Sequence, residues 1–187
     1  MSTTINDNPA RDGRRNGGLQ FLDDISGYRV HHDDIDPRGY VVKLNSGETV
    51  GEVEGLLADV SARVVRYVEV EMDRDVIDRH ERGLYGTDDR HALLPVGLIH
   101  IDRENRTVTL NGVAYDHLTD YPRFDRKHGY TTGHELDTAD YLAGFHEYGA
   151  TYDRERYATP TYRDADRLDD DFYTSDFYVT RSTRPIA

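Results

Sequence analysis

The chain has 187 residues and a formal charge of −13, with 36 acidic and 23 basic side chains. This excess of carboxylates argues against a general binder of nucleic acid or anionic membranes, because phosphate surfaces recruit Lys and Arg in excess. The absence of cysteine excludes disulfides and thiolate chemistry. No apolar run approaches the ~20 residues that cross a bilayer, and the polar start lacks the apolar centre of a secretory signal. We therefore expect a cytoplasmic protein with no direct membrane insertion.

The acidic composition has two explanations. Aspartate outnumbers glutamate, and lysine occurs only at positions 43 and 127. Adaptation to salt would favour solvated carboxylates that keep the surface hydrated, whereas a GC-rich genome encodes Arg for Lys and Asp for Glu. The second explanation is the simpler one.

The first ordered segment is expected at Leu19, because residues 1–18 are polar and glycine-rich and predict a disordered N-terminal arm. A structural turn is predicted at Asp36-Pro37-Arg38-Gly39, where proline fixes φ and glycine carries no Cβ. Strands are expected over Gly39–Leu44 and Val50–Val53, joined in a hairpin, and Gly55 predicts a bulge in the continuation of the second strand.

Three further strands are expected over Val64–Met72, Leu93–Ile101 and Val108–Leu110, with residues 73–91 as a loop. Several short strands with no helix between them predict an all-β fold, a small antiparallel β-barrel that spans residues 19–122. A single helical turn is expected near its end, stopped by Pro122. Apolar side chains alternate onto both faces of Leu93–Ile101, which indicates that this strand is covered on both sides.

The composition changes over residues 123–187, a Tyr-rich and Asp-rich extension with few aliphatic residues. One short helix is predicted near residues 138–148, with Asp137 as its N-cap and Gly149 as its C′ residue. The rest of the extension is expected to be largely irregular, disordered or loosely docked. The alternative is that its tyrosine rings anchor it on the barrel.

Four motifs in order resemble the PRC-barrel domain of the photosynthetic reaction centre H subunit. Asp34–Leu44 contains the Asp-Pro-Arg-Gly entry to a strand, and Thr49–Asp59 resembles the family element G-x-V-x-x-L-x-x-D. Val65–Met72 resembles R-Y-L-E-V-E, and Leu93–Asp102 resembles L-L-P-I-G-x-x-x-I-D. The chain lacks the transmembrane helix of that subunit, so the closer resemblance is to stand-alone, H subunit-like PRC-barrel proteins.

The resemblance implies that one face of Val64–Met72 binds a partner or relays protons. Its candidate residues are Arg66, Tyr67, Glu69 and Glu71. The simpler interpretation is that Glu69 and Glu71 lie on a solvated strand face, because runs of charge are mostly exposed.

Other polar clusters lack the spacing of a known site. Adjacent residues of the extended segment His31–Asp36 point to opposite sides and chelate one ion poorly. His80, Asp88, Asp89 and His91 match no recognised ligand pattern, and Asp169-Asp170-Asp171 lacks the glycine and spaced acids of a calcium loop. We therefore predict no catalytic residue, no metal and no cofactor.

The leading hypothesis is a non-enzymatic protein-binding or adaptor module that forms a homodimer or binds another protein. An apolar sheet face needs a cover, which a second copy, a partner or the extension would supply. Two alternatives stay open: a soluble H subunit-like factor in photosynthetic or respiratory electron-transfer assembly, and an acidic stress-response or salt-response protein.

Overall fold

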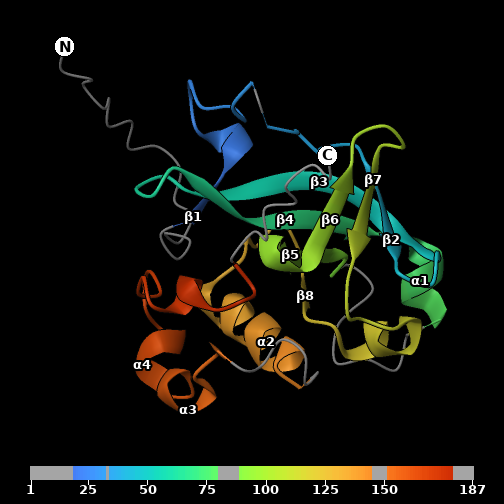
Figure 1. Cartoon of the computed structure of the whole chain (residues 1–187). Helices are drawn as coiled ribbons and strands as arrows, with labels where there is room; N and C mark the ends of the chain where they lie inside the picture. Colours follow the sequence, from blue (N-terminus) through green and yellow to red (C-terminus); the bar gives the residue numbers. More distant parts are fainter. Residues whose placement is uncertain (1–18, 33, 80–88, 145–150, 179–187) are drawn as a thin grey trace.

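The computed structural model describes residues 19–32, 34–79, 89–144 and 151–178 (Figure 1). The described chain is mostly β-sheet. Its strands are β1 (Leu19–Phe21), β2 (Val41–Leu44), β3 (Thr49–Asp59), β4 (Val64–Met72), β5 (His91–Pro95), β6 (Ile99–Asp102), β7 (Thr107–Leu110) and β8 (Arg123–Phe124). Its α-helices are α1 (Arg74–Arg79), α2 (Thr132–Leu142), α3 (Arg154–Tyr157) and α4 (Pro160–Arg163). Short 3₁₀ helices are η1 (Leu22–Asp24), η2 (Val96–Leu98), η3 (Tyr115–Asp120) and η5 (Phe172–Thr174).

The eight strands form one sheet in the order β6-β7-β2-β3-β4-β5-β8, with β1 paired to β3. All ladders are antiparallel except β2 with β7, which is parallel and aligns Val41 with Thr107. The predicted antiparallel topology is therefore wrong at this pairing. Closure into a barrel is not confirmed either, because no ladder among the described strands joins β6 to β8. The local hairpins were readable from the sequence, whereas the β2–β7 pairing joins distant segments that no local pattern connects.

The entry to β2 is a tight turn. The amide of Tyr40 donates to the carbonyl of Pro37 at 2.9 Å, and Gly39 has a φ of +75°. The guanidinium of Arg38 bonds the carboxylate of Asp36 and also pairs with Asp23. The hydrogen bonds from Arg38 lower the pKa of Asp36. The turn is thus fixed by one glycine conformation and by the two ion pairs of Arg38 at the surface.

Two irregularities in the β3–β4 ladder set the directions of the β4 side chains. The register shifts between Val53 and Gly55, which confirms the predicted bulge, and again between Leu57 and Ala58. The second shift leaves Arg66 without an opposite residue, between the Leu57–Tyr67 and Ala58–Val65 pairs. Because a bulge interrupts the alternation of a strand, Arg66 and Tyr67 both reach the C-terminal extension.

The strand predicted over Leu93–Ile101 is broken in the structure. It consists of β5, the 3₁₀ turn η2 and β6, so the predicted alternation of apolar side chains along one continuous strand is wrong. Pro95 stands at the N-cap of η2, and the amide of Gly97 donates to the carbonyl of Phe177 at 2.8 Å. The chain leaves the sheet at this point, because the Gly97 amide bonds the extension and not a neighbouring strand.

Two helices differ from the sequence prediction. Part of the predicted 73–91 loop is helix α1, whose Val76 and Ile77 are buried; residues 80–88 lie outside the described chain. Helix α2 begins at Thr132 rather than near 138, because Thr131 caps it: its hydroxyl accepts from the His134 amide, and its amide donates to His134 Nδ1 at 2.8 Å. Asp137 lies inside this helix, and Gly149 lies outside the described residues.

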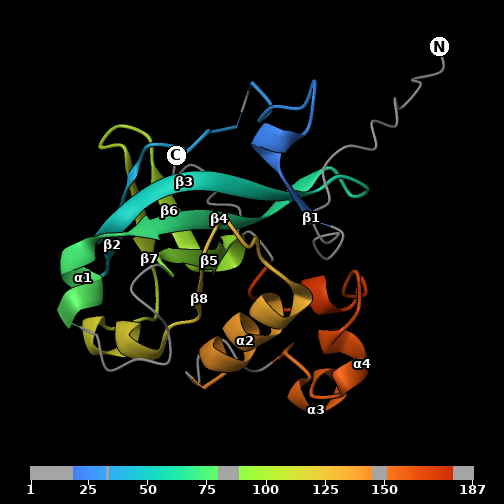
Figure 2. The ribbon, with the colours of Figure 1, turned by 180° about the vertical axis from the view of Figure 1, so that it is seen from behind.

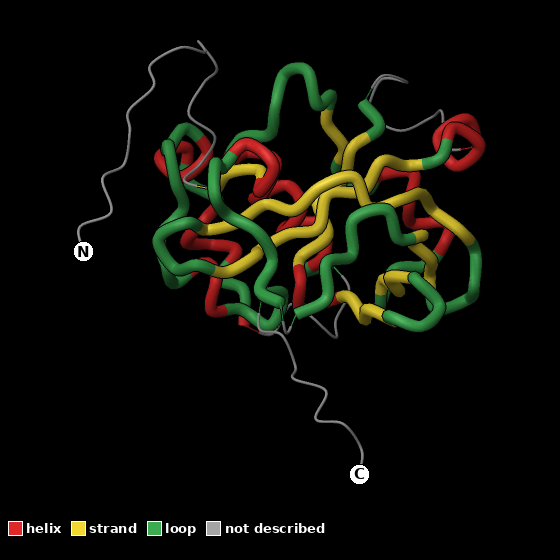
Figure 3. The backbone as a smooth tube through the Cα atoms, turned by 90° about the horizontal axis from the view of Figure 1, so that it is seen from above, coloured by secondary structure: helices red, strands yellow, loops and turns green. Residues whose placement is uncertain are grey.

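Residues 151–178 pack against the sheet rather than docking loosely. They are irregular between the short helices α3, α4 and η5, as expected, but they bury Leu168, Phe172, Phe177 and Tyr178. These side chains join the sheet residues in one continuous hydrophobic core. Figure 2 shows α2, α3 and α4 together on one side of the sheet. In Figure 3 the strands cross the middle of the molecule, with helices and loops around them.

Among the helices of the described residues, none combines the length and apolarity that a bilayer crossing requires.

Candidate functional site

Two tyrosine hydroxyls meet where the extension covers β4. Tyr67, from β4, and Tyr178, from the end of the described extension, are buried, and their hydroxyl oxygens lie 2.5 Å apart. The rings meet edge to face with centroids separated by 5.3 Å. Burial raises the pKa of both phenols, so both stay protonated near neutral pH. The sheet and the extension are therefore joined by a neutral hydrogen bond in a dry environment.

A buried carboxyl group lies beside this pair. Glu135 is on the buried face of α2 and is 0% exposed. The hydroxyl of Tyr173 donates to Glu135 Oε2 at 2.7 Å, whereas Oε1 has no hydrogen-bond partner among the residues that the structure describes. Burial raises the pKa of Glu135 to about 8, although hydrogen bonds from Tyr173 and Tyr67 and the charge of Arg167 oppose the rise. At neutral pH this carboxyl group therefore holds its proton.

An ion-pair cluster borders the tyrosines. Asp59 is 1% exposed and pairs with Arg167 Nη2 at 3.3 Å and with Arg66 Nη2 at 3.7 Å. The Arg66 guanidinium also lies over the Tyr173 ring, 4.8 Å from its centroid. Burial acts to raise the pKa of Asp59, but bonds from the Ser61 hydroxyl, the Ala62 amide and Arg167 outweigh it and lower the pKa. Asp59 therefore remains ionised and holds both arginines against the sheet.

A further buried acid, Glu69, lies on β4 two residues after Tyr67. Glu69 is 0% exposed, and its Oε1 lies 3.1 Å from His91 Nδ1 and 3.5 Å from Arg126 Nε. The expectation of a solvated face is wrong for this residue. Its carboxylate occupies the space above Gly55, where a Cβ would overlap Glu69 Oε2. The bulge glycine of β3 thus makes room for the acid of β4.

The candidate face of β4 is therefore divided between two environments. Arg66 and Tyr67 contact the extension, and Glu69 faces His91 and Arg126. Glu71 is partly exposed and pairs with Arg90 at 2.9 Å. The structure brings Tyr67 to Glu135, and it places Arg66 over the ring of Tyr173, which donates to the same carboxyl group. The sequence analysis did not identify Glu135.

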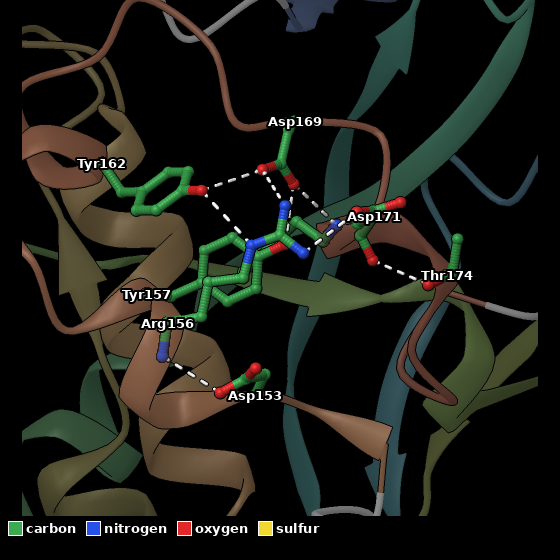
Figure 4. Close-up of polar contacts among 8 residues, drawn as sticks. Asp153, Arg156, Tyr157, Tyr162, Asp169, Asp171 and Thr174 are labelled. Atoms are coloured by element: carbon green, nitrogen blue, oxygen red, sulfur yellow. Dashed lines mark hydrogen bonds and ion pairs between the residues drawn. The ribbon is translucent and has the colours of Figure 1, made fainter.

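The aspartates at 169–171 pair with neighbouring side chains, and Figure 4 shows the contacts of Asp169 and Asp171. Arg156 donates to Asp169 at 2.7 Å and to Asp171 at 2.9 Å, and Tyr157 donates to Asp169 at 2.7 Å. Asp170 pairs with Arg167 at 2.6 Å. These contacts hold α3 against the segment before η5, so the acidic run ties the extension together.

The remaining candidates do not converge on one point. The rings of His31 and His32 lie 4.2 Å apart at the surface, and His91 faces Glu69. Asp33, His80 and Asp88 lie outside the described chain. Among the residues whose placement is described, no group of three or more His, Cys, Asp or Glu side chains is arranged to hold a metal ion.

The sequence analysis missed Glu135, Tyr173 and Tyr178. A signal for Glu135 was available: Thr131 and His134 form a capping pair, and the buried Leu136, Ala139 and Leu142 continue one helix face. For the two tyrosines the only signal was the repeated aromatic pair Phe172-Tyr173 and Phe177-Tyr178.

The arrangement can store a proton and couple two packed segments. The acid, the phenols and their hydrogen bonds lie between β4, α2 and η5, and the ion pairs of Asp59 border them. No protein-family model matches the chain, and no curated protein matches it either.

Proposed function

We propose that this chain is a non-enzymatic protein-binding module of the PRC-barrel type, and that it binds a second copy of itself. The observation that carries the proposal is the edge strand β6. Within the described part of the chain, β6 pairs only with β7, which leaves its other side open for strand addition.

The hydrogen-bond pattern identifies the groups on the open side of β6. The Asn111 amide donates to the Leu98 carbonyl at 2.9 Å, so the Leu98–Asn111 pair is a bonded one. Bonded and non-bonded pairs alternate along an antiparallel ladder, and His100 and Asp102 therefore bond β7. The N–H and C=O groups of Ile99 and Ile101 point the other way, toward the open edge.

Charge favours one register for a second copy. Around a two-fold axis at Ile101, each His100 lies opposite Asp102 of the other copy. His100 is exposed, and hydrogen bonds from Asn105 lower the pKa of Asp102, which keeps it ionised. The two cross-strand pairs therefore have opposite charge when histidine is protonated. The net charge of −13 opposes association, so salt that screens long-range repulsion supports the dimer.

The test is sedimentation of the full chain and of two variants at about 0.15 M salt. Ile101→Pro removes the outward amide, which an edge strand tolerates, and Ile101→Ala is the matched control that removes side-chain volume but keeps the amide. We expect the wild type and Ile101→Ala to form dimers and Ile101→Pro to be monomeric. A monomeric wild type, or a dimer that survives Ile101→Pro, contradicts the proposal.

A second candidate is a proton-carrying role in an electron-transfer assembly. It is favoured by one observation, that β4 and α2 each contribute a fully buried carboxyl group, Glu69 and Glu135. Buried ionisable groups of this kind are typical of functional sites. Its test is affinity capture from membranes with the tagged full chain. Recovery of redox or photosynthetic subunits supports this candidate, and their absence contradicts it.

A further inference from the structure

We propose that the C-terminal extension is a proton-controlled latch: it is docked on β4 while Glu135 carries a proton, and it opens when that proton is lost. The inference is independent of the self-association proposed above. It concerns the described residues 151–178 and their contact with the sheet.

The geometry of Glu135 favours the protonated state of the docked form. The carboxyl group is completely buried. The Tyr173 hydroxyl donates to Oε2 at 2.7 Å, and the Tyr67 hydroxyl also acts on the group as a hydrogen-bond donor. Oε1 has no hydrogen-bond partner in the described structure. An ionised carboxylate in a dry site needs several donors or a dedicated cation, so ionisation is costly here.

The groups that face Glu135 do not compensate its charge. They come from β3, β4, the segment before α2 and the extension, and they are Asp59, Tyr67, Tyr130, Arg167, Tyr173 and Tyr178. Among them Arg167 is the only cation, and it already pairs with Asp59 and Asp170. Arg66 also pairs with Asp59 and lies over Tyr173. Both arginines are thus committed to other carboxylates.

The extension is the segment that opens, because side-chain contacts and one backbone hydrogen bond attach it to the sheet, and no strand ladder does so among the described residues. These contacts are the Tyr67–Tyr178 hydroxyl bond, the bond from the Gly97 amide to the Phe177 carbonyl, the Asp59–Arg167 ion pair, Arg66 over the Tyr173 ring, and the packing of Leu168, Phe172 and Phe177. By contrast, β3 and β4 are joined by a ladder along most of their length. Lifting η5 and Tyr178 from β4 exposes Glu135 to water, where its carboxylate is stable.

The sign of the effect follows from linkage. In the open form Glu135 has an ordinary pKa near 4.5, and in the docked form its pKa is about 8. Opening therefore releases a proton throughout this interval, and the opening equilibrium rises about tenfold for each pH unit. Below the interval both forms are protonated, above it both are ionised, and opening no longer depends on Glu135.

The experiment is native-state hydrogen exchange of the full chain at about pH 5.5 and pH 7.5, with rates corrected for intrinsic exchange. For amides of α3 and η5 we expect opening to rise roughly 100-fold between these two values in the wild type. Glu135→Gln keeps an acceptor for Tyr173 and cannot ionise, so we expect the opening of the extension in this variant to be independent of pH. Glu71→Gln, a change on the half-exposed β4 acid, is the matched control and retains the wild-type dependence.

The comparison of the wild type with Glu135→Gln isolates Glu135, because the two chains differ at that residue alone. Equal pH dependence in the wild type and Glu135→Gln overturns the latch. If Glu135→Gln does not fold, the wild type alone tests the proposal. A pH dependence of opening that is confined to amides of the extension supports the latch. A dependence shared with the β3–β4 amides, or absent, overturns it.

Discussion

The backbones of Gly97 and Phe177 are in direct contact, with the Gly97 amide bonded to the Phe177 carbonyl at 2.8 Å. A Cβ at position 97 would lie 2.6 Å from that carbonyl oxygen and would also overlap the Asp176 carbonyl. Glycine is therefore required at the point where the Leu-Leu-Pro-Val-Gly segment meets the extension.

Gly97→Ala should displace the extension from η2. Because backbone atoms oppose the new methyl group, we expect a loss of about 1–3 kcal/mol in the free energy of unfolding. Urea denaturation measures the loss, and Val96→Ala, at the half-buried neighbour, is the control with a smaller effect. Equal stability of Gly97→Ala and the wild type would show that the extension does not press on this turn.

Gly55→Ala should push the Glu69 carboxylate out of its position. We expect a loss of about 1–3 kcal/mol in the free energy of unfolding, since the buried acid has little room to move. In a Glu69→Ala background the same change should cost almost nothing. A double-mutant cycle by urea denaturation measures this coupling, and additive effects would contradict it.

The hydrogen bond between the Tyr67 and Tyr178 hydroxyls should likewise make the stability effects of substituting its two partners non-additive. Tyr67→Phe or Tyr178→Phe alone leaves one buried hydroxyl without this partner and should cost about 1–2 kcal/mol. The double change to phenylalanine removes both groups and should cost less than the sum of the single changes. Thermal and urea denaturation of the three variants test this, and a fully additive result would argue against a direct bond.

Asp59 should stabilise the fold only above the pH at which it ionises. Its pKa is lowered in the folded state, so its contribution is present above the usual value near 3.8 and is lost as pH falls through the lower folded value. At pH 7, Asp59→Asn should cost on the order of 3 kcal/mol, because two arginines lose a buried partner.

The control for Asp59 is Asp170→Asn, since Asp170 pairs with the same Arg167 but is 82% exposed. Its cost should not exceed about 1 kcal/mol. Urea denaturation at neutral and strongly acidic pH provides the measurement. A difference between wild type and Asp59→Asn that persists in acid would contradict the assigned role.

Salt should raise the thermal midpoint of the chain. The charge of −13 produces self-repulsion that screening relieves, and this effect is required if the protein responds to salt or osmotic stress. Thermal denaturation between about 0.05 and 1 M salt measures it, against the same range of a neutral osmolyte. A flat or falling midpoint would remove that hypothesis.

Local patterns in the sequence predicted those elements that local interactions determine. The alternation in Val64–Met72 gave β4, and the bulge at Gly55 was expected from its residue type. The burial of Glu69 was missed because the space for it comes from Gly55 on another strand. No property of Glu69 itself signals this neighbour.

The packing of the extension was predicted only as the alternative to disorder, and for a different reason. Its buried groups are mainly aromatic, and the Asp and Arg residues between them lower the average hydropathy to that of a disordered chain. The structure pairs those charges with one another, as Arg156 pairs with Asp169 and Asp171. Pairing depends on the three-dimensional arrangement, so composition alone suggested disorder.

The parallel alignment of Val41 with Thr107 has a consequence for synthesis of the protein. The strands β2 and β3 can form their hairpin as soon as they leave the ribosome. However, β2 cannot pair with its second neighbour until β7 has been translated. The Tyr67 side of β4 waits longer still, until Tyr178 emerges. Throughout this time a nascent chain exposes an unfinished sheet, and unpaired strand edges of this kind are prone to aggregation.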